Sequence, residues 1–155
     1  MFNVVLVEPE IPNNTGNIGR TCVATGCSLH LVEPFGFELS DKQLKRAGLD
    51  YWVHLNWKTY KNLSNFQQQS APGKKVYFSA HGKKSFYEYQ FSENDFLIFG
   101  KETKGLDPEI LSENAEHCYH IPTPGNVRSL NLATAVAIVI YEGYRQVRHN
   151  IQTSV

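Results

Sequence analysis

The sequence lacks most of the features that mark secreted or metal-binding proteins. It has only three cysteines, Cys22, Cys27 and Cys118, whose odd number and irregular spacing fit neither a disulfide framework nor a zinc site. The six histidines are scattered and form no cluster with ligand spacing. The first residues carry no basic segment and no small-residue cleavage site. We therefore expect a reduced cytoplasmic setting, three core cysteines and no bound metal.

An excess of charge of one sign is also missing. Fifteen basic and fifteen acidic side chains give a net formal charge of zero, so binding to a nucleic acid would need a local patch. Lys42, Lys45 and Arg46 lie close together on a short helix expected over residues 41–47, where they could contact phosphates or simply form a solvated face. The most apolar run, which begins at Leu132, is too short to span a bilayer, and this excludes a transmembrane protein.

Two nucleotide-binding fingerprints are absent as well. Gly16 and Gly19, which follow the first apolar run, do not form G-x-G-x-x-G, and their loop has no P-loop lysine and hydroxyl pair. A metabolic NAD-dependent enzyme is therefore disfavoured. An apolar run, a Gly-containing loop and a helix in this order still suit a phosphate or nucleotide site, with an ordinary strand-to-helix turn as the alternative.

What the sequence does have is a regular alternation of short apolar runs and helical segments. With 155 residues and 41% hydrophobic composition, it is expected to form one domain over residues 1–155. The alternation predicts an α/β fold with a mostly parallel sheet and helices on both faces. Strands are expected over residues 2–7, 29–32, 51–55, 76–80, 95–99 and 117–121, and helices from about residue 20 to 25 and over residues 41–47, 60–69 and 131–144.

Unusual polar clusters follow four of these expected strands. They lie in the loops after Val7, Ala80, Phe99 and Ile121. In parallel α/β sheets, ligands bind beyond the carboxyl ends of the strands. These four loops are therefore the predicted site.

The last of these loops leads into the most apolar helix of the chain. Pro122 and Pro124 keep the loop out of regular structure, and either Ser129 or Asn131 can cap the helix that follows. A cap does not explain Arg128 beside them, which favours a functional site. The helix is apolar almost all round and must be buried on most sides, so we expect it to be covered by a second copy of the chain in a homodimer.

Three ordered motifs resemble those of a known family. They are Asn14-x-Gly16-Asn17-Ile18-Gly19-Arg20, then residues 97–106 (LIFGKETKGL), then Ile121-Pro122 followed by residues 129–132 (SLNL). Together they resemble the SpoU branch of the SPOUT RNA methyltransferases over about residues 1–145. The short chain is most similar to the YibK/TrmL type, which 2′-O-methylates the wobble nucleotide, position 34 (C or a modified U), of leucine tRNAs.

The resemblance implies more than the residues alone could. It implies a homodimer, a deep trefoil knot over about residues 76–142, S-adenosylmethionine as methyl donor with S-adenosylhomocysteine as product, and no metal. The substrate would be the anticodon stem-loop of tRNA. The implied donor-binding residues are Phe78, Ser79, Gly100, Glu102, Gly105, Ile121, Pro122, Ser129 and Leu130. The implied catalytic and substrate-binding residues are Asn14, Arg20, Glu102, Ser129 and Asn131.

The residue types suit methyl transfer to a ribose hydroxyl. Arg20 would hold the adjoining phosphate and polarise the 2′-OH, because a guanidinium keeps its proton too firmly to act as a base. Asn14 and Asn131 would orient ribose or loop groups. Ser129 would bond the donor or relay a proton, and Glu102 would stabilise the loop or the cationic donor, or simply cap backbone N–H groups. A non-catalytic RNA-binding module that retains the donor pocket is the alternative to an enzyme.

Overall fold

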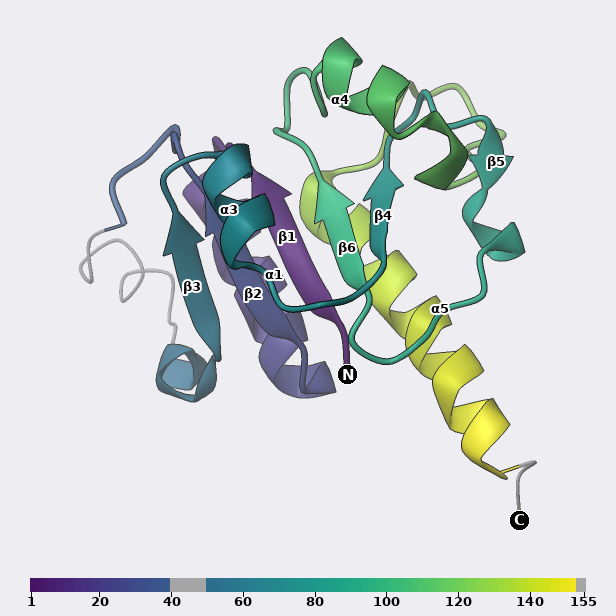
Figure 1. Cartoon of the computed structure of the whole chain (residues 1–155), viewed down its shortest axis with the longest axis horizontal. Coiled ribbons are helices and arrows are strands. Elements are labelled where there is room, and N and C mark those ends of the chain that lie inside the picture. Colours follow the sequence, from purple (N-terminus) through teal and green to yellow (C-terminus); the bar gives the residue numbers. More distant parts are fainter. Residues whose placement is uncertain (40–49, 153–155) are drawn as a thin grey trace.

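The chain forms a seven-stranded sheet in which every strand pair is parallel. The computed structural model describes residues 1–39 and 50–152, with side chains up to residue 148, so the helix expected over residues 41–47 lies outside the described residues. The strand order β3-β2-β1-β6-β4-β7-β5 departs widely from the sequence order (Figure 1). The predicted parallel α/β sheet is confirmed. The strands are β1 (Asn3–Val7), β2 (Ser28–Val32), β3 (Trp57–Tyr60), β4 (Lys75–Phe78), β5 (Lys84–Ser85), β6 (Phe96–Phe99) and β7 (Cys118–His120).

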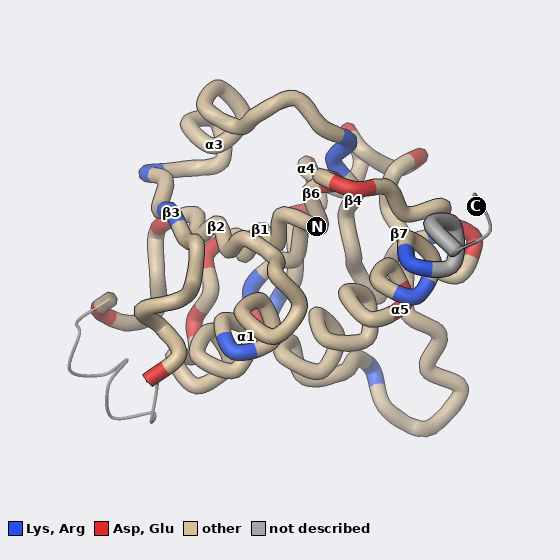
Figure 2. Tube along the Cα trace, turned by 90° about the horizontal axis from the view of Figure 1, so that it is seen from below, with Lys and Arg blue, Asp and Glu red and all other residues tan. Residues whose placement is uncertain are grey.

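Helices cover both faces of the sheet, as the alternation predicted. Figure 2 shows α1 (Pro12–Thr25) and α5 (Leu132–Gln152) on one face, and α3 (Leu63–Gln69) and α4 (Pro108–Glu113) on the other. Side chains alternate along β1, so Leu6 joins the core under α1 and α5 while Val5 joins the core under α3 and α4. Three short 3₁₀ segments complete the described elements: Asp50–His54, Phe86–Glu88 and Ala115–His117.

The sheet register brings four loop-bearing strand ends together. Phe99 at the end of β6 pairs with Leu6 of β1 on one side and with Phe78 of β4 on the other. Phe78 in turn pairs with Tyr119 of β7. The loops after β1, β4, β6 and β7 therefore leave the same edge of the sheet, which is the arrangement expected from the sequence.

One predicted strand is wrong, and two predicted helices have the wrong first residue. Helix α1 begins at Pro12 and not near residue 20, because the fixed φ of a proline suits the first turn of a helix, so Gly16 and Gly19 lie in the helix and not in a loop. Residues 51–55 lie mostly in the 3₁₀ segment, because Trp52 packs against Gly19 of α1. A Cβ on Gly19 would lie only 2.6 Å from the Trp52 ring. The third strand is instead β3, which contains Tyr60. Helix α3 begins three residues later than expected, after Asn62, whose side chain accepts a hydrogen bond from the backbone N–H of Asn65 at 2.8 Å.

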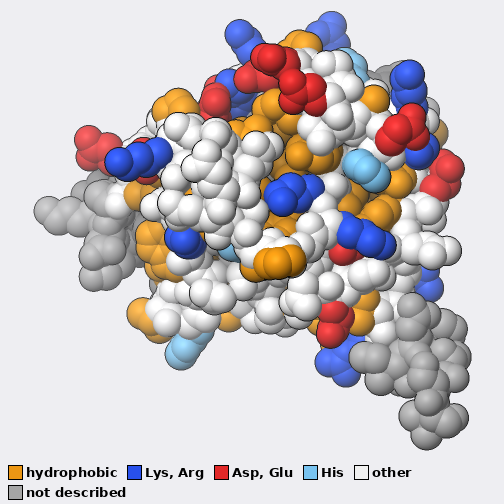
Figure 3. Space-filling view, in the orientation of Figure 1, with side chains coloured by type: hydrophobic (Ala, Val, Ile, Leu, Met, Phe, Trp, Pro, Cys, Tyr) orange, Lys and Arg blue, Asp and Glu red, His pale blue; other side chains and the backbone are white. Residues whose placement is uncertain are grey.

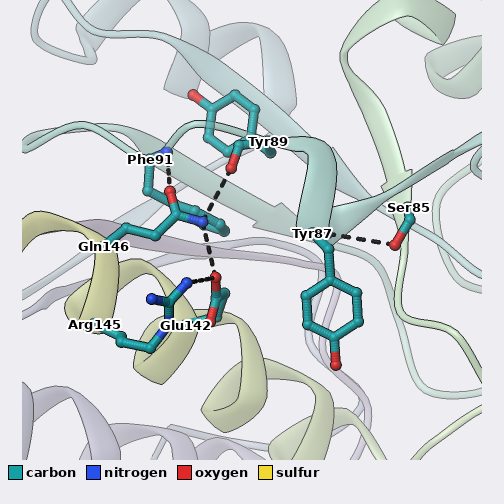
Figure 4. A network of polar contacts seen from close by, with 7 residues as sticks. All are labelled: Ser85, Tyr87, Tyr89, Phe91, Glu142, Arg145 and Gln146. Carbon is teal, nitrogen blue, oxygen red and sulfur yellow. Dashed lines mark hydrogen bonds and ion pairs between the residues drawn. The ribbon is translucent and has the colours of Figure 1, made fainter.

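The last helix is longer than predicted and is fastened to the chain between β5 and β6. The Gln146 side chain accepts from the backbone N–H of Phe91 at 3.1 Å and donates to the carbonyl of Tyr89 at 3.2 Å (Figure 4). Glu142 accepts a further bond from Gln146 and pairs with Arg145. In the same view the Ser85 hydroxyl accepts from the N–H of Tyr87 at the start of a 3₁₀ turn.

The three cysteines are buried and unpaired, as expected for core residues. Burial raises the thiol pKa of both Cys22 and Cys27, so neither is an activated nucleophile. Among the described residues, no helix is long and apolar enough to cross a membrane.

Candidate functional site

A cavity of about 480 Å³ lies at the edge where the four loops meet. Its volume falls in the range of small-molecule sites. Its walls come from the ends of β4, β6 and β7, from the loops that follow them, and from the first turn of α5. The lining residues are Phe78, Ser79, Ala80, His81, Phe99, Gly100, Lys101, Glu102, Thr103, Lys104, Gly105, His120, Ile121, Thr123, Arg128, Ser129, Leu130, Leu132 and Ala135.

The structure gathers most of the sequence-predicted donor residues around this one cavity. Every predicted donor-binding residue except Pro122 is among the lining residues. Of the predicted catalytic residues, Glu102 and Ser129 line it, whereas Asn14, Arg20 and Asn131 do not. The predicted donor-binding residues therefore form the cavity wall, whereas three of the predicted catalytic residues lie outside it.

Asn14, Glu102 and Asn131 form one hydrogen-bonded chain that joins the three motifs. The Asn14 amide donates to Glu102 Oε1 at 3.2 Å, and its oxygen accepts from the Asn131 amide at 3.0 Å. Asn14, at the centre of this network, is 6% exposed, whereas Glu102 is half-buried and Asn131 is exposed. The network fixes the loops around the cavity relative to α1.

Each end of this network also holds a helix terminus. Glu102 accepts from the backbone N–H groups of Glu10 at 2.7 Å and Ile11 at 3.0 Å, just before α1 begins. Asn131 caps α5 by accepting from the N–H groups of Ala133 and Thr134. Asn131, rather than Ser129, is thus the cap that the sequence left open, and Glu102 does cap backbone N–H groups.

The loop after β6 is a tight turn with no space for a side chain at its first residue. A Cβ on Gly100 would lie 2.1 Å from the carbonyl carbon of Gly105 and 2.2 Å from the nitrogen of Leu106. Gly105 donates to the carbonyl of Lys101 at 2.8 Å and adopts a φ of +68°, which favours glycine. The turn presents residues 100–105 to the cavity.

Two carboxylates from the loop after β1 hold the outer side of this turn. Glu8 pairs with Lys101 at 2.6 Å, and its hydrogen bond raises the pKa of Lys101. Glu10 accepts from both the backbone N–H and the hydroxyl of Thr103. Glu8 adopts a φ of +53°, a conformation that non-glycine residues rarely take and that clusters at functional sites.

Arg20 lies outside the cavity, on the exposed side of α1. Its guanidinium stacks over the ring of Tyr51, 4.9 Å from the centroid, and the Tyr51 hydroxyl donates to the carbonyl of Gly16 at 2.5 Å. Burial raises the pKa of Tyr51, and the neighbouring Arg20 opposes that shift. The 3₁₀ segment that was predicted as a strand therefore serves to orient Arg20.

The cavity wall combines apolar surface with hydrogen-bonding groups. Phe78, Phe99 and Leu130 supply apolar surface, and Ser79 supplies a hydroxyl. His120 also lines the cavity, and its Nδ1 is buried without a hydrogen-bond partner. An unpartnered buried polar atom is uncommon in a folded protein, and here it lies at the wall of a cavity.

Positive charge is present at the rim although the chain is neutral. Lys104 and Arg128 are exposed and line the cavity. Elsewhere charge is dispersed, and Figure 3 shows basic and acidic side chains interspersed over one face. Within the part of the chain that the structure describes, no group of three or more His, Cys, Asp or Glu could hold a metal ion.

Sequence reasoning missed Glu8, Glu10, Thr103 and Tyr51. Their partners lie far away in sequence, 93 residues in each of the two glutamate pairs and 35 for Tyr51 with Gly16. The one local indication that Glu8 and Glu10 contribute to the site was their position directly after the first strand.

Comparison with known proteins places these features in a family. The model of the SpoU rRNA Methylase family matches residues 1–141. A Saccharophagus degradans protein called tRNA (cytidine(34)-2'-O)-methyltransferase is 49% identical over 147 residues, which cover 94% of this chain and 96% of that protein. A Burkholderia pseudomallei protein of the same name is 45% identical, with 94% and 96% covered.

Solved structures share the fold. One that concerns 2-OH methylation of C/U34 on tRNA superposes with a TM-score of 0.90 at 47% identity, covering 96% of this chain and 97% of that one. An AdoMet-bound rRNA methyltransferase from Sinorhizobium meliloti superposes with a TM-score of 0.81 at 28% identity, covering 93% of this chain and 56% of that one.

Proposed function

The chain belongs to the SpoU methylase family, and from that premise we propose that it is a tRNA (cytidine/uridine(34)-2′-O)-methyltransferase acting on the wobble nucleotide of leucine tRNAs in the cytoplasm. The observation that carries the proposal is the convergence of all three motifs on one cavity: the second and third line it, and the first is bonded to both through Asn14. The relatives named for this activity support the position of the target nucleotide.

S-adenosylmethionine fits the cavity as methyl donor. When bound, it supplies a methyl group on a positively charged sulfur. Phe78, Phe99 and Leu130 would contact its apolar surface, and Ser79, Ser129 and the unpartnered His120 Nδ1 would accept or donate hydrogen bonds. The turn of residues 100–105 would close one side and exclude water. The other predicted donor residues, Glu102, Gly105 and Ile121, lie in the same wall, whereas the remaining one, Pro122, does not line it.

The RNA would approach over the exposed basic rim. Lys104 and Arg128 can attract phosphates locally, so the protein can bind RNA without a net positive charge. The rate enhancement then comes mainly from positioning the ribose hydroxyl in line with the methyl group. Ser129 lines the cavity and is a candidate to relay the hydroxyl proton. Asn14 and Asn131 contribute by fixing the loops.

A homodimer would complete this site. Arg20 does not line the cavity of its own chain but stands exposed on α1, held by Tyr51. A partner packed on the α1 and α5 face would bring its own Arg20 to the cavity of the first chain. Helix α5 supports such packing, because Leu132 and Ile138 are only half-buried and Tyr141 is 54% exposed.

We expect sedimentation to show a dimer at micromolar concentration. Tyr141→Glu should weaken it, because a charge would be buried in an apolar contact. Tyr87→Glu is the matched control, since Tyr87 is also an exposed tyrosine, at 66%, but belongs to the 3₁₀ segment Phe86–Glu88 and not to α5. A stable, active monomer at micromolar concentration would contradict the dimer.

The activity itself can be tested with labelled donor. Purified protein should transfer methyl groups to the wobble ribose of leucine tRNA anticodon stem-loops, and cells lacking the protein should lack that mark. A chelator should leave the rate unchanged once the RNA is folded, because the chemistry needs no metal. Donor binding without any transfer to tRNA would instead favour the non-catalytic RNA-binding module.

We also propose that the chain is knotted over about residues 76–142. The strand order supports this, because after β4 the chain runs to β5 at the end of the sheet, returns to insert β6 between β1 and β4, and then places β7 between β4 and β5. An experimental chain trace in which α5 does not thread the loop between β4 and β6 would contradict the knot.

A further inference from the structure

Two loops around the cavity exchange hydrogen bonds in both directions. Glu10, from the loop after β1, accepts from the backbone N–H of Thr103 at 3.0 Å and from the Thr103 hydroxyl at 2.9 Å. Glu102, from the loop after β6, accepts from the backbone N–H of Glu10 at 2.7 Å. Each loop therefore supplies a carboxylate that holds the backbone of the other.

Glu10 is itself fixed from behind. The backbone N–H of Gly36 donates to the carbonyl of Pro9 at 3.0 Å. A Cβ on Gly36 would lie 2.7 Å from Cα of Glu10, so the chain after β2 packs directly against this residue. The backbone of Glu10 is thus held by the chain after β2, and its side chain is held by its two bonds to Thr103.

The turn that it supports has few bonds of its own. Within residues 100–105, the Gly105 N–H donates to the Lys101 carbonyl, and the inner side of the turn faces the cavity. Its outer side is tied by Glu8 through Lys101 and by Glu10 through Thr103. The ion pair is partly exposed, with 20% and 30% of the two side chains accessible, and such pairs contribute little. The bonds of Glu10 to a backbone N–H and a hydroxyl are the more directional tie.

We infer that Glu10 is a positioning residue that preorganises the turn of residues 100–105 for the methyl donor. The inference rests on the function proposed above. Glu10 is not among the residues that line the cavity, so it acts through Thr103. Without this tie, the donor would have to order the turn as it binds, and that ordering lowers affinity. Once the donor is bound the turn is in place, so the chemical step should change little.

The test compares five full-length variants with the wild type: Glu10→Ala, Glu10→Gln, Thr103→Val, the double variant of Glu10→Ala with Thr103→Val, and Glu93→Ala. Glu10→Ala should raise the Kd for S-adenosylmethionine about tenfold, while the single-turnover rate at saturating donor stays within about twofold. Glu10→Gln should keep most of the affinity, because its amide oxygen can still accept from Thr103. The double variant should lose less donor affinity than the sum of the losses in Glu10→Ala and Thr103→Val, because each single change already removes the contact between the Glu10 carboxylate and the Thr103 hydroxyl. Glu93→Ala, at an exposed carboxylate before β6, is the control.

Hydrogen exchange of the ligand-free protein gives a readout that needs no donor. Glu10→Ala should speed exchange in the peptide that contains residues 100–106, and Glu93→Ala should not. Unchanged exchange in Glu10→Ala, or a slower transfer rate at saturating donor with an unchanged Kd, overturns the inference. A wild-type protein that binds no donor refutes the proposed function instead, and the exchange result still decides whether Glu10 orders the turn.

Discussion

Arg20→Ala is expected to leave donor affinity nearly intact while methyl transfer falls about 30- to 1,000-fold. The factor corresponds to about 2–4 kcal/mol, the usual loss when a charge-assisted contact made in the transition state is removed. Donor affinity should survive because Arg20 is assigned to the RNA phosphate and the 2′-OH and not to the donor. The measurement is donor calorimetry beside single-turnover methylation.

Two further variants sharpen this result. Arg20→Lys should rescue little, because an ammonium cannot reproduce the planar guanidinium fork. Lys58→Ala is the control: Lys58 is exposed on β3 and also lies over a tyrosine ring, that of Tyr60 at 5.0 Å, but far along the sheet from the cavity. If Arg20→Ala lost donor binding and kept its transfer rate at saturating donor, the assignment of Arg20 to the RNA would be wrong.

Gly100→Ala should lower donor affinity by on the order of 100-fold, about 2.7 kcal/mol. The added Cβ meets backbone atoms of Gly105 and Leu106, which cannot rotate away as a flexible side chain could. The turn must therefore move, and one wall of the cavity moves with it. Calorimetry with S-adenosylhomocysteine measures the loss, and thermal unfolding shows whether the damage stays local.

Gly125→Ala is the matched control for this glycine. Gly125 lies in the loop of the third motif, where an added Cβ would meet nothing within 4 Å. Its donor affinity should equal that of the wild type. Equal affinity in Gly100→Ala as well would mean that the turn of residues 100–105 does not contact the donor.

Mixed dimers of the Arg20→Ala and Gly100→Ala chains test whether Arg20 acts on the cavity of the partner chain. If Arg20 serves the partner's cavity, the subunit with an intact cavity receives an intact Arg20 from the other chain. At a donor concentration well below the Kd of Gly100→Ala, mixed dimers should then methylate RNA faster than either variant alone. If no mixture is more active than the single variants, Arg20 acts on the cavity of its own chain.

The sequence predicted what depends on local order. Residues 96–99 form a continuous apolar run, and such runs reveal strands directly. Since parallel strands end at one edge, the motifs that follow them could be grouped from their positions in the sequence alone. Gly100 and Ser129 were placed in one site by this reasoning, and the cavity brings them together.

What depends on partners distant in sequence could not be predicted. Tyr51 lies in a segment predicted as a strand, yet its hydroxyl donates to Gly16 and its ring lies under the guanidinium of Arg20. Nothing in periodicity indicates that Glu10 holds Thr103, or that β6 inserts between β1 and β4. Such pairings follow from tertiary packing, which overrides local preference.

The insertion of β6 beside β1 has a consequence for synthesis on the ribosome. β1 is translated first, and β2 can pair with it at once, but its other neighbour is encoded far downstream. Until β6 emerges, the apolar strand Asn3–Val7 presents an open hydrogen-bonding edge, the kind of surface through which nascent chains aggregate. The end of the sheet that carries the cavity is thus assembled only when translation is well into its second half.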